Sequence, residues 1–259
     1  MSYETVKWEQ DGGVGRITLN RPETLNAWTE EFGRELGEVV NQRAADPSVR
    51  AVVITGAGRG FSAGQDLREF SELQESLEDA LEATYHPNIR LIRGLAKPVI
   101  AAVNGPVAGA GLSLASACDV RVASSAAAFV PGFVGIGLVP DSGGTWFLHR
   151  LLGFARAFEW MCSNRRLDAG EALAWGLVSE VIPAEEFEAR VAEIAATWAA
   201  MPTQAVGMTK QLFDHAGTAS LEEQLALEAQ LQQASVATAD FAEGVGAFLE
   251  KRPPSFTGA

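Results

Sequence analysis

The chain has 259 residues, of which 47% are hydrophobic and 20% are charged, and its formal net charge is −13 at pH 7. This composition is typical of a globular protein of one large domain. The acidic charge argues against nucleic-acid binding through a basic surface, and no run approaches the ~18 apolar residues that predict a membrane span. We therefore expect neither a nucleic-acid nor a membrane partner.

The two cysteines, Cys118 and Cys162, do not have the C-x2-C spacing of a metal site. The first ten residues are polar and lack the apolar core of a signal peptide. Reduced thiols, no bound metal and a cytoplasmic location are the expectations that follow.

Apolar spacing predicts alternating strands and helices in the first part of the chain. Strands are expected at Val14–Asn20 and Ala51–Thr55, with a helix at Thr29–Arg43 between them. A glycine-rich loop follows the second strand. The stretch Leu67–Leu95 is mostly helical in pattern and is predicted to break at His86-Pro87.

The alternation continues to about residue 182, and the chain from Ala184 onward is almost entirely helical in pattern, with breaks near Pro202, Gly217 and Asp240. This order predicts an α/β core over residues 1–183 and a helical region over residues 184–259. The predicted elements in this part of the core are strands at Pro98–Val103, Val120–Ala123 and Ala128–Val130, and helices at Gly109–Ala117, Ser142–Leu152 and Ala169–Gly176.

Two segments share the order strand, glycine-rich turn, helix: AVVITGAGRGFSAGQDL at 51–67 and PVIAAVNGPVAGAGLSLASACD at 98–119. Small residues let a ligand approach the backbone, and a helix that begins after such a turn presents unpaired N–H groups. Two such groups converging on one point would form an oxyanion hole, although ordinary α/β connections look the same in a sequence. The first loop is not a G-x-G-x-x-G dinucleotide fingerprint, because Phe61 stands where the third glycine belongs.

Asp141 lies among largely apolar neighbours in GIGLVPDSGGTWFL at 135–148. Facing an apolar wall, its carboxyl would be desolvated and its pKa raised, which suits proton transfer. Asp141 also precedes the helix predicted from Ser142, where it would serve as an N-cap and be stabilised as the anion. The residues alone leave both roles open.

Several of these segments resemble the crotonase (enoyl-CoA hydratase/isomerase) superfamily. FSAGQDL at 61–67 and AAVNGPVAGAGLSLASACD at 101–119 are similar to its two hallmark segments. RPETLNA at 21–27 is similar to its N-terminal ligand-binding segment, and LDAGEALAWGLVSEVI at 167–182 to the segment after its core. The resemblance implies an α/β, crotonase-like spiral of ββα turns followed by a helical C-terminal trimerisation region, and hence a homotrimer or homohexamer.

The resemblance also implies an acyl-CoA substrate whose thioester oxygen is held by two backbone N–H groups. By motif, these belong to Ala63 and Ala110. Gly64, Gln65 and Asp66 would line the same loop. No metal or separate cofactor is implied, because CoA enters as part of the substrate.

Hydratases of this superfamily carry two glutamates, at positions occupied here by Ser113 and Phe133. Neither side chain can act as a carboxylate base, which argues against hydration. LVPDSGGTWFLHR at 138–150 resembles the branch that contains ring-1,2-epoxyphenylacetyl-CoA isomerase, in which an aspartate at the position of Asp141 is the acid/base. The sequence thus predicts an isomerase of a 3-enoyl or 2,3-epoxy acyl-CoA that forms a thioester enolate and shuttles a proton through Asp141.

Three alternatives accompany this prediction. The protein could be an enoyl-CoA hydratase acting on a 2-enoyl-CoA. A dehalogenase-like hydrolase would use the same aspartate as a nucleophile, but it pairs that residue with a tryptophan and a histidine whose positions are Phe133 and Arg90 here. A non-catalytic acyl-CoA binder would keep the glycine loops and have no need of Asp141.

Overall fold

The computed structural model describes residues 3–72 and 76–259, and it confirms the predicted α/β class. The main sheet has six strands in the order β1-β2-β3-β4-β6-β9. Its first two strands form an antiparallel hairpin, and the others add in parallel. The strands are β1 (Val6–Asp11), β2 (Val14–Leu19), β3 (Ala51–Gly56), β4 (Val99–Val103), β6 (Val120–Ser124) and β9 (Glu180–Ile182).

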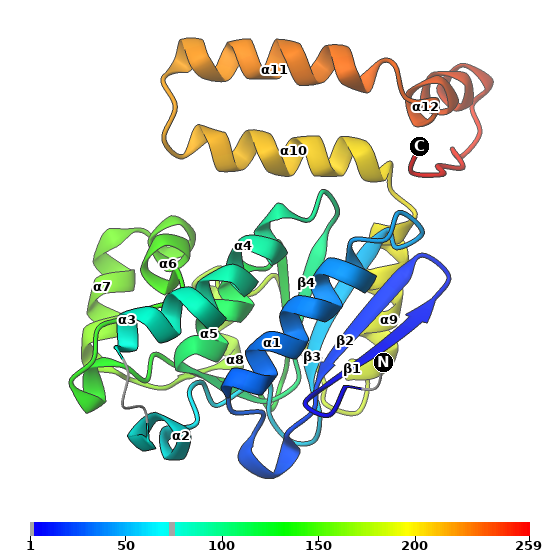
Figure 1. Cartoon of the computed structure of the whole chain (residues 1–259). Helices are drawn as coiled ribbons and strands as arrows, with labels where there is room; N and C mark the ends of the chain where they lie inside the picture. The colour runs from blue at the N-terminus through cyan, green and yellow to red at the C-terminus, as the bar shows by residue number, and fades with distance from the viewer. Residues whose placement is uncertain (1–2, 73–75) are drawn as a thin grey trace.

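Both faces of β3 are buried, as expected for a central parallel strand. Val52 packs into the core beneath α1 (Glu30–Val39) and α4 (His86–Gly94). Val53, on the opposite face, packs against α9 (Phe187–Ala199). Figure 1 shows α1 and α4 on one side of the sheet and α9 on the other.

A second sheet contains the short strands β5 (Pro106–Ala108), β7 (Ala128–Val130) and β8 (Leu167–Asp168). The first glycine loop reaches its edge, because Ser62 forms a parallel bridge to Val107. Successive turns of the chain therefore add one strand to the main sheet, a shorter extended segment to the small sheet, and a helix. This is the predicted spiral of ββα turns.

The predicted break at His86-Pro87 is wrong. The helix α3 (Leu77–Ala80), a π-helical turn (Leu81–Tyr85) and α4 follow one another without a gap. The π turn changes the hydrogen-bonding register, so Pro87 falls in the first turn of α4, where a missing N–H loses no partner. Within the predicted stretch 67–95, α2 (Leu67–Glu72) is present, and residues 73–75 lie outside the described part.

The remaining helices match the predicted spacing. The small-residue helix α5 has the predicted bounds, and the C-terminal breaks lie near residues 202, 217 and 238. α7 was not predicted. Among the described residues, no helix is long and apolar enough to cross a membrane. The bounds are α5 (Gly109–Ala117), α6 (Gly144–Leu152), α7 (Phe154–Ser163), α8 (Ala169–Ala174), α10 (Thr203–Ala216), α11 (Leu221–Ser235) and α12 (Ala239–Glu250).

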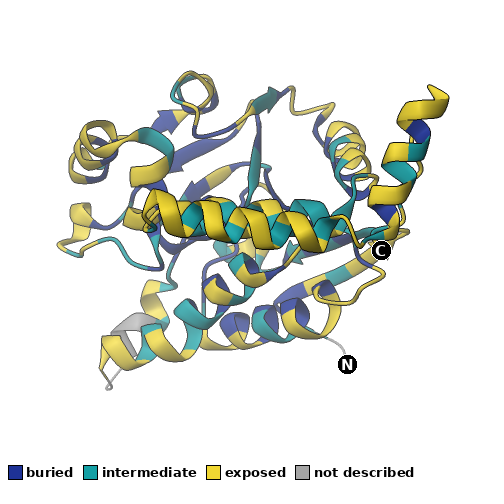
Figure 2. Cartoon of the chain, turned by 90° about the horizontal axis from the view of Figure 1, so that it is seen from above, coloured by how far each residue is buried: buried dark blue, intermediate teal, exposed yellow. Residues whose placement is uncertain are grey.

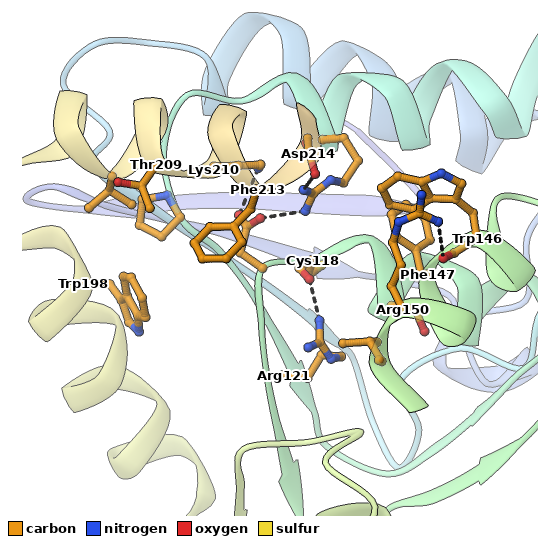
Figure 3. A pocket seen from close by; sticks show the side chains of 16 residues that line it. Cys118, Arg121, Trp146, Phe147, Arg150, Trp198, Thr209, Lys210, Phe213 and Asp214 are labelled. Carbon is orange, nitrogen blue, oxygen red and sulfur yellow. Dashed lines mark hydrogen bonds and ion pairs between the residues drawn. The ribbon is translucent and has the colours of Figure 1, made fainter. Parts of the chain in front are cut away.

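The helices α10 and α11 lie antiparallel above the core (Figure 1), and α11 has no buried residue. Seen from above, α11 is largely exposed (Figure 2). The helix α10 is fastened to the core by ion pairs (Figure 3). Asp119 accepts from Arg93 at 2.7 Å and from Lys210 at 2.9 Å, and Arg93 also pairs with Asp214. The proposed boundary near Ala184 stays a prediction.

The Lys97 side chain, just before β4, holds the turn that precedes β3. Its buried ammonium group donates to the carbonyl oxygens of Ala44 at 2.9 Å, Asp46 at 2.7 Å and Val49 at 2.7 Å. Burial lowers the pKa of this amine, and the three hydrogen bonds satisfy all its donors.

The substitution Lys97→Met keeps an unbranched side chain but leaves three carbonyl oxygens without this donor. We expect the free energy of unfolding to fall by about 2–4 kcal/mol, measured by urea denaturation at pH 7. Lys7→Met, on the exposed side of β1, is the control and should change it by less than about 0.5 kcal/mol. Equal losses in the two variants would contradict this role for Lys97.

Candidate active site

The two glycine loops leave the ends of β3 and β4 and run side by side. The Phe61 N–H donates to the carbonyl of Pro106 at 3.0 Å, and the Ala108 N–H donates to that of Ser62 at 2.9 Å. A Cβ placed on Gly111 would lie 2.6 Å from the Ser62 Cβ, so only glycine permits this contact. The loops therefore meet backbone to backbone.

The Asn26 side chain supports the first glycine loop through hydrogen bonds to its backbone. Its fully buried side-chain amide donates to the carbonyl oxygens of Ala57 at 3.0 Å, Gly60 at 2.9 Å and Phe61 at 3.1 Å, while its Oδ1 accepts from the Arg21 N–H at 2.8 Å. Sequence reasoning missed this role. RPETLNA marked the segment, but the function of Asn26 depends on a left-handed backbone (φ 55°) that apolar spacing cannot reveal.

The Ala63 amide is not free. Its N–H donates to the carbonyl of Leu25 at 2.9 Å, which contradicts the prediction that it binds the thioester oxygen. The residue itself still lines the pocket described below. A motif identifies the loop, but which amide points inward depends on how the loop is paired.

The Gln65 amide, two residues further along the first loop, is oriented differently. Trp28 forms a parallel bridge to Gln65. The Trp28 N–H donates to the Gly64 carbonyl at 2.7 Å, and the Asp66 N–H donates to the Trp28 carbonyl at 2.9 Å. This pattern turns the Gln65 N–H away from Trp28, and it has no acceptor among the described residues. A Cβ on Gly64 (φ 84°) would lie 3.2 Å from the Ala110 nitrogen, so the turn sits directly against the start of α5.

Ala110 lies in the first turn of α5, where N–H groups have no partner within the helix. The preceding amide, of Gly109, donates to Pro131 at 3.1 Å. Gln65 and Ala110 line the same pocket, and neither amide has an acceptor among the described residues. Ala110 thus lies in the pocket, and its role as a donor to the thioester oxygen stays a prediction.

The pocket has a volume of about 150 Å³ and a mainly apolar wall. Asp141 is the only titratable residue among the described residues that line it. Gly64 and Asp66 are not among its lining residues, and the Asp66 carboxylate pairs with Arg21 at 3.1 Å. The apolar wall consists of Leu67, Leu77, Leu81, Phe133, Ile136 and Leu138.

The structure excludes the N-cap role, which is one of the two roles that the residues left open for Asp141. Helix α6 begins at Gly144, after Gly143, and no side chain caps it. The backbone carbonyl of Asp141 accepts from the Gly144 N–H at 2.8 Å and from the Ser113 hydroxyl at 3.0 Å, while its carboxyl stays uncommitted. Burial raises the pKa of this carboxyl, and the nearby Ser142 hydroxyl and His86 charge lower it. A buried carboxyl with a raised pKa that lines a pocket is a candidate for proton transfer.

His86, on α4, is the histidine whose charge lowers the pKa of Asp141. Its Nδ1 lies 2.9 Å from Glu82 Oε1. Arg90, the position compared with the dehalogenase histidine, is exposed and pairs with the same glutamate at 3.1 Å. One helical turn separates the two residues, and neither is among the residues that line the pocket. Within residues 3–72 and 76–259, no group of three His, Cys, Asp or Glu is placed to hold a metal.

The sequence matches the family model described as enoyl-CoA hydratase/isomerase over residues 9–259. The chain belongs to the enoyl-CoA hydratase/isomerase family. It is 44% identical to a probable enoyl-CoA hydratase of Rhodobacter capsulatus over the whole of both chains. It is 42% identical to the 1,2-epoxyphenylacetyl-CoA isomerase of Escherichia coli over 95% of each chain. A crystal structure of an enoyl-CoA hydratase from Bacillus anthracis superposes with a TM-score of 0.92 at 32% identity, covering 98% of this chain and 100% of that one, so the fold is the crotonase fold.

In this family member, Asn26→Asp tests the support of the first loop. The variant keeps the size and the tolerance of a left-handed backbone but points a carboxylate at three carbonyl oxygens. We expect the free energy of unfolding to fall by at least about 2 kcal/mol, measured by urea denaturation. Asn20→Asp is the control, because the Asn20 side chain makes one exposed hydrogen bond to the Glu4 carbonyl. An unchanged Asn26→Asp protein would show that the amide is not needed.

Asp141→Asn should stabilise the protein in a pH-dependent way. The folded-state pKa of Asp141 is raised above its ordinary value of 3.8, so ionisation opposes folding as pH rises through the folded-state pKa. We expect a higher melting temperature for the variant above that pKa and no difference below pH 3.8, measured by calorimetry across pH. A gain that is the same at every pH would mean that the carboxyl charge is not its cause.

Proposed function

We propose that this protein is an acyl-CoA isomerase that forms a thioester enolate and moves a proton through Asp141. The observation that carries the proposal is the composition of the pocket. Gln65 and Ala110, whose amides have no acceptor among the described residues, and the desolvated carboxyl of Asp141 line a cavity whose other walls are mostly apolar. Such a cavity suits the acyl chain of a thioester together with a single acid/base.

The Gln65 and Ala110 amides bind the thioester oxygen as negative charge develops on it. Each such donor contributes about 3 kcal/mol of transition-state stabilisation when it is preorganised. The ionised Asp141 removes a C2 proton from a 3-enoyl-CoA, and the electron pair moves onto the thioester oxygen to give a dienolate. The neutral Asp141 then returns the proton to C4, which yields the 2-enoyl-CoA with no net gain or loss of atoms.

Hydration needs a second group that places and splits water, and this pocket offers little for that purpose. The Ser113 hydroxyl already donates to the Asp141 carbonyl, and Phe133 contributes an apolar ring. The relative from Rhodobacter capsulatus is named as a hydratase, so hydration is the alternative that the experiment below must separate.

The acyl group belongs to the 3-enoyl or 2,3-epoxy class. The Escherichia coli relative, named for an epoxyphenylacetyl-CoA, supports an epoxide on the acyl group. A ring-bearing acyl group would also suit the apolar wall. The reaction needs no cofactor beyond the CoA carried by the substrate, and we place it in the cytoplasm.

We further propose that the C-terminal helices assemble the protein as a homotrimer or homohexamer. Large apolar side chains on α11 and α12 are uncovered in the protomer, and Phe248 is 82% exposed. Burying such side chains against a second copy would remove them from water. The exposed set includes Leu221, Leu225, Phe241, Val245, Phe248 and Leu249.

Asp141→Asn is the decisive variant for the chemistry. With 3-hexenoyl-CoA, we expect the wild type to form 2-hexenoyl-CoA and the variant to lose about 10²–10⁴-fold in kcat. Product formation is measured by chromatography. Asp119→Asn provides a control carboxylate, since Asp119 lies in the α10 ion-pair cluster.

Two outcomes would contradict the proposed function. Rapid formation of 3-hydroxyhexanoyl-CoA from 2-hexenoyl-CoA that survives in Asp141→Asn would mean that another group activates water. Binding of hexanoyl-CoA without any turnover by the wild type, on either enoyl ester, would identify a binder rather than an isomerase.

A further inference from the structure

A second cavity lies between the core and the C-terminal helices. Its volume is about 510 Å³, which is within the range of small-molecule sites. It shares no lining residue with the active-site pocket, which contains Asp141. Ala110, at the start of α5, lines the active-site pocket, whereas Ser116 and Cys118, at the other end of α5, line this cavity. Because a helix rises about 1.5 Å per residue, the two sites are roughly 10 Å apart along α5.

Aromatic rings from three helices line the cavity. Trp198 lies on α9, Phe213 on α10, and Trp146 and Phe147 on α6. In Figure 3, Trp198 and Phe213 lie on one side of Arg121, and the α6 residues lie on the other. The Phe213 side chain is 78% exposed, so a ligand ring placed against it would remove apolar surface from water. The walls therefore suit a flat apolar group.

The charges around the cavity are unbalanced. The described residues that line it include four basic and two acidic side chains. The ion-pair cluster that fastens α10 to the core contains two of each sign, so its charges compensate one another. Arg121 and Arg150 are left, and neither forms an ion pair with any residue that the structure describes. In a chain with a net charge of −13, this local excess of positive charge favours an anionic ligand.

Arg121 is half-buried at the start of β6 and is held by backbone carbonyls. Its Nε donates to Leu177 at 2.8 Å, and its Nη1 donates to Cys118 at 2.6 Å. Its Nη2 has no acceptor in the described part of the chain. Burial lowers the pKa of this guanidinium. A partly buried cation without a paired carboxylate keeps its desolvation penalty, and an anion bound in the cavity would offset that penalty.

Arg150 adds a second cation at the edge of the cavity. Its guanidinium carbon lies 3.7 Å from the centroid of the Trp146 ring, and its Nη1 donates to the Trp146 carbonyl at 3.2 Å. A Cβ on Gly217 would lie 3.1 Å from the Arg150 Nη2, so this side chain reaches from α6 to the end of α10. A guanidinium held flat on a ring is preorganised to face an anion or a further ring.

We propose that this cavity binds a small aromatic carboxylate. The ligand ring lies among the aromatic side chains of α6, α9 and α10, and the carboxylate accepts hydrogen bonds from Arg121, with Arg150 adding positive charge. A single carboxylate matches the planar donors of one guanidinium. A phosphate ester carries more negative charge and would be repelled by Asp119 and Asp214, which line the same cavity. The site does not depend on the proposed isomerase function.

Calorimetric titration of the whole chain with 2-naphthoate tests the proposal. We expect saturable binding with a dissociation constant below about 1 mM. The neutral analogue 2-naphthamide keeps the ring and loses the charge, so it should bind at least about tenfold more weakly. AMP, which offers an aromatic ring with a phosphate ester, should also bind more weakly than 2-naphthoate.

Two surface variants locate the bound ligand. Arg150→Gln and Phe213→Ala change exposed side chains, and each should weaken 2-naphthoate binding at least about fivefold. Arg156→Gln is the matched control for the first, because Arg156 lies 5.1 Å from the centroid of the Trp175 ring and does not line the cavity. Phe248→Ala is the matched control for the second, because Phe248 is 82% exposed on α12. Both controls should bind like the wild type.

Arg121→Lys tests the carboxylate partner. Lysine keeps the charge but lacks the planar pair of donors, so we expect about tenfold weaker binding of 2-naphthoate. The melting temperature of the variant shows whether it folds, since Arg121 also supports two carbonyls. If the variant does not fold, Arg150→Gln and the comparison with 2-naphthamide still decide the proposal.

Four results would overturn the proposal. They are no saturable binding of 2-naphthoate below about 10 mM, equal affinity for 2-naphthoate and 2-naphthamide, tighter binding of AMP, and unchanged affinity in both Arg150→Gln and Phe213→Ala. Leu81→Ala supplies a further check, because Leu81 lines only the active-site pocket. A loss of 2-naphthoate binding in Leu81→Ala would place the ligand in that pocket and would also overturn the proposal.

Discussion

The backbone contact between the two glycine loops is the constraint on which the site depends. Gly64 leaves no room for a Cβ beside the Ala110 nitrogen, and Gly111 leaves none beside Ser62. With no side chain between the loops, amides from two distant parts of the sequence reach the same pocket. The ladder β3-β4 brings the loops to the same edge of the sheet, and Asn26 keeps the first loop pressed against the second. A methyl group at either glycine would push the two loops apart and so separate Gln65 from Ala110.

Asp141 and the amides of the two glycine loops are positioned by different means. The amides are fixed by glycine contacts and by the bridge at Trp28. Asp141 precedes two consecutive residues with left-handed backbone, Ser142 and Gly143. The Ser113 hydroxyl donates a hydrogen bond to the backbone carbonyl of Asp141. The Ser113 side chain thus holds the turn that carries Asp141.

Much of the fold followed from the sequence because the signals are local. The apolar run at 51–55, the small residues of 109–117 and the helix breaks in the C-terminal region each reflect a short-range requirement. The strand β1 was missed because its residues, VKWEQD, are mostly polar, and it is placed by pairing with β2. The two loops and Asp141, which the sequence singled out, line one pocket, and the roles of Ala110 and Asp141 there stay predictions. The hydrogen bond that the Ala63 amide makes to Leu25 and the support from Asn26 were not predictable, because each depends on a tertiary hydrogen bond.

The continuous helix from Leu77 to Gly94 has a mechanical consequence. Its first turns supply Leu77 and Leu81 to the apolar wall of the pocket, and Tyr85 and His86 follow in the next turn of the same continuous helix. Because the π turn joins these parts without a break, a shift of the helix that widens the pocket also displaces Tyr85 and the Trp28 ring that stacks on it. Trp28 in turn bridges to Gln65 in the first glycine loop, so the apolar wall and that loop are mechanically coupled through one aromatic pair.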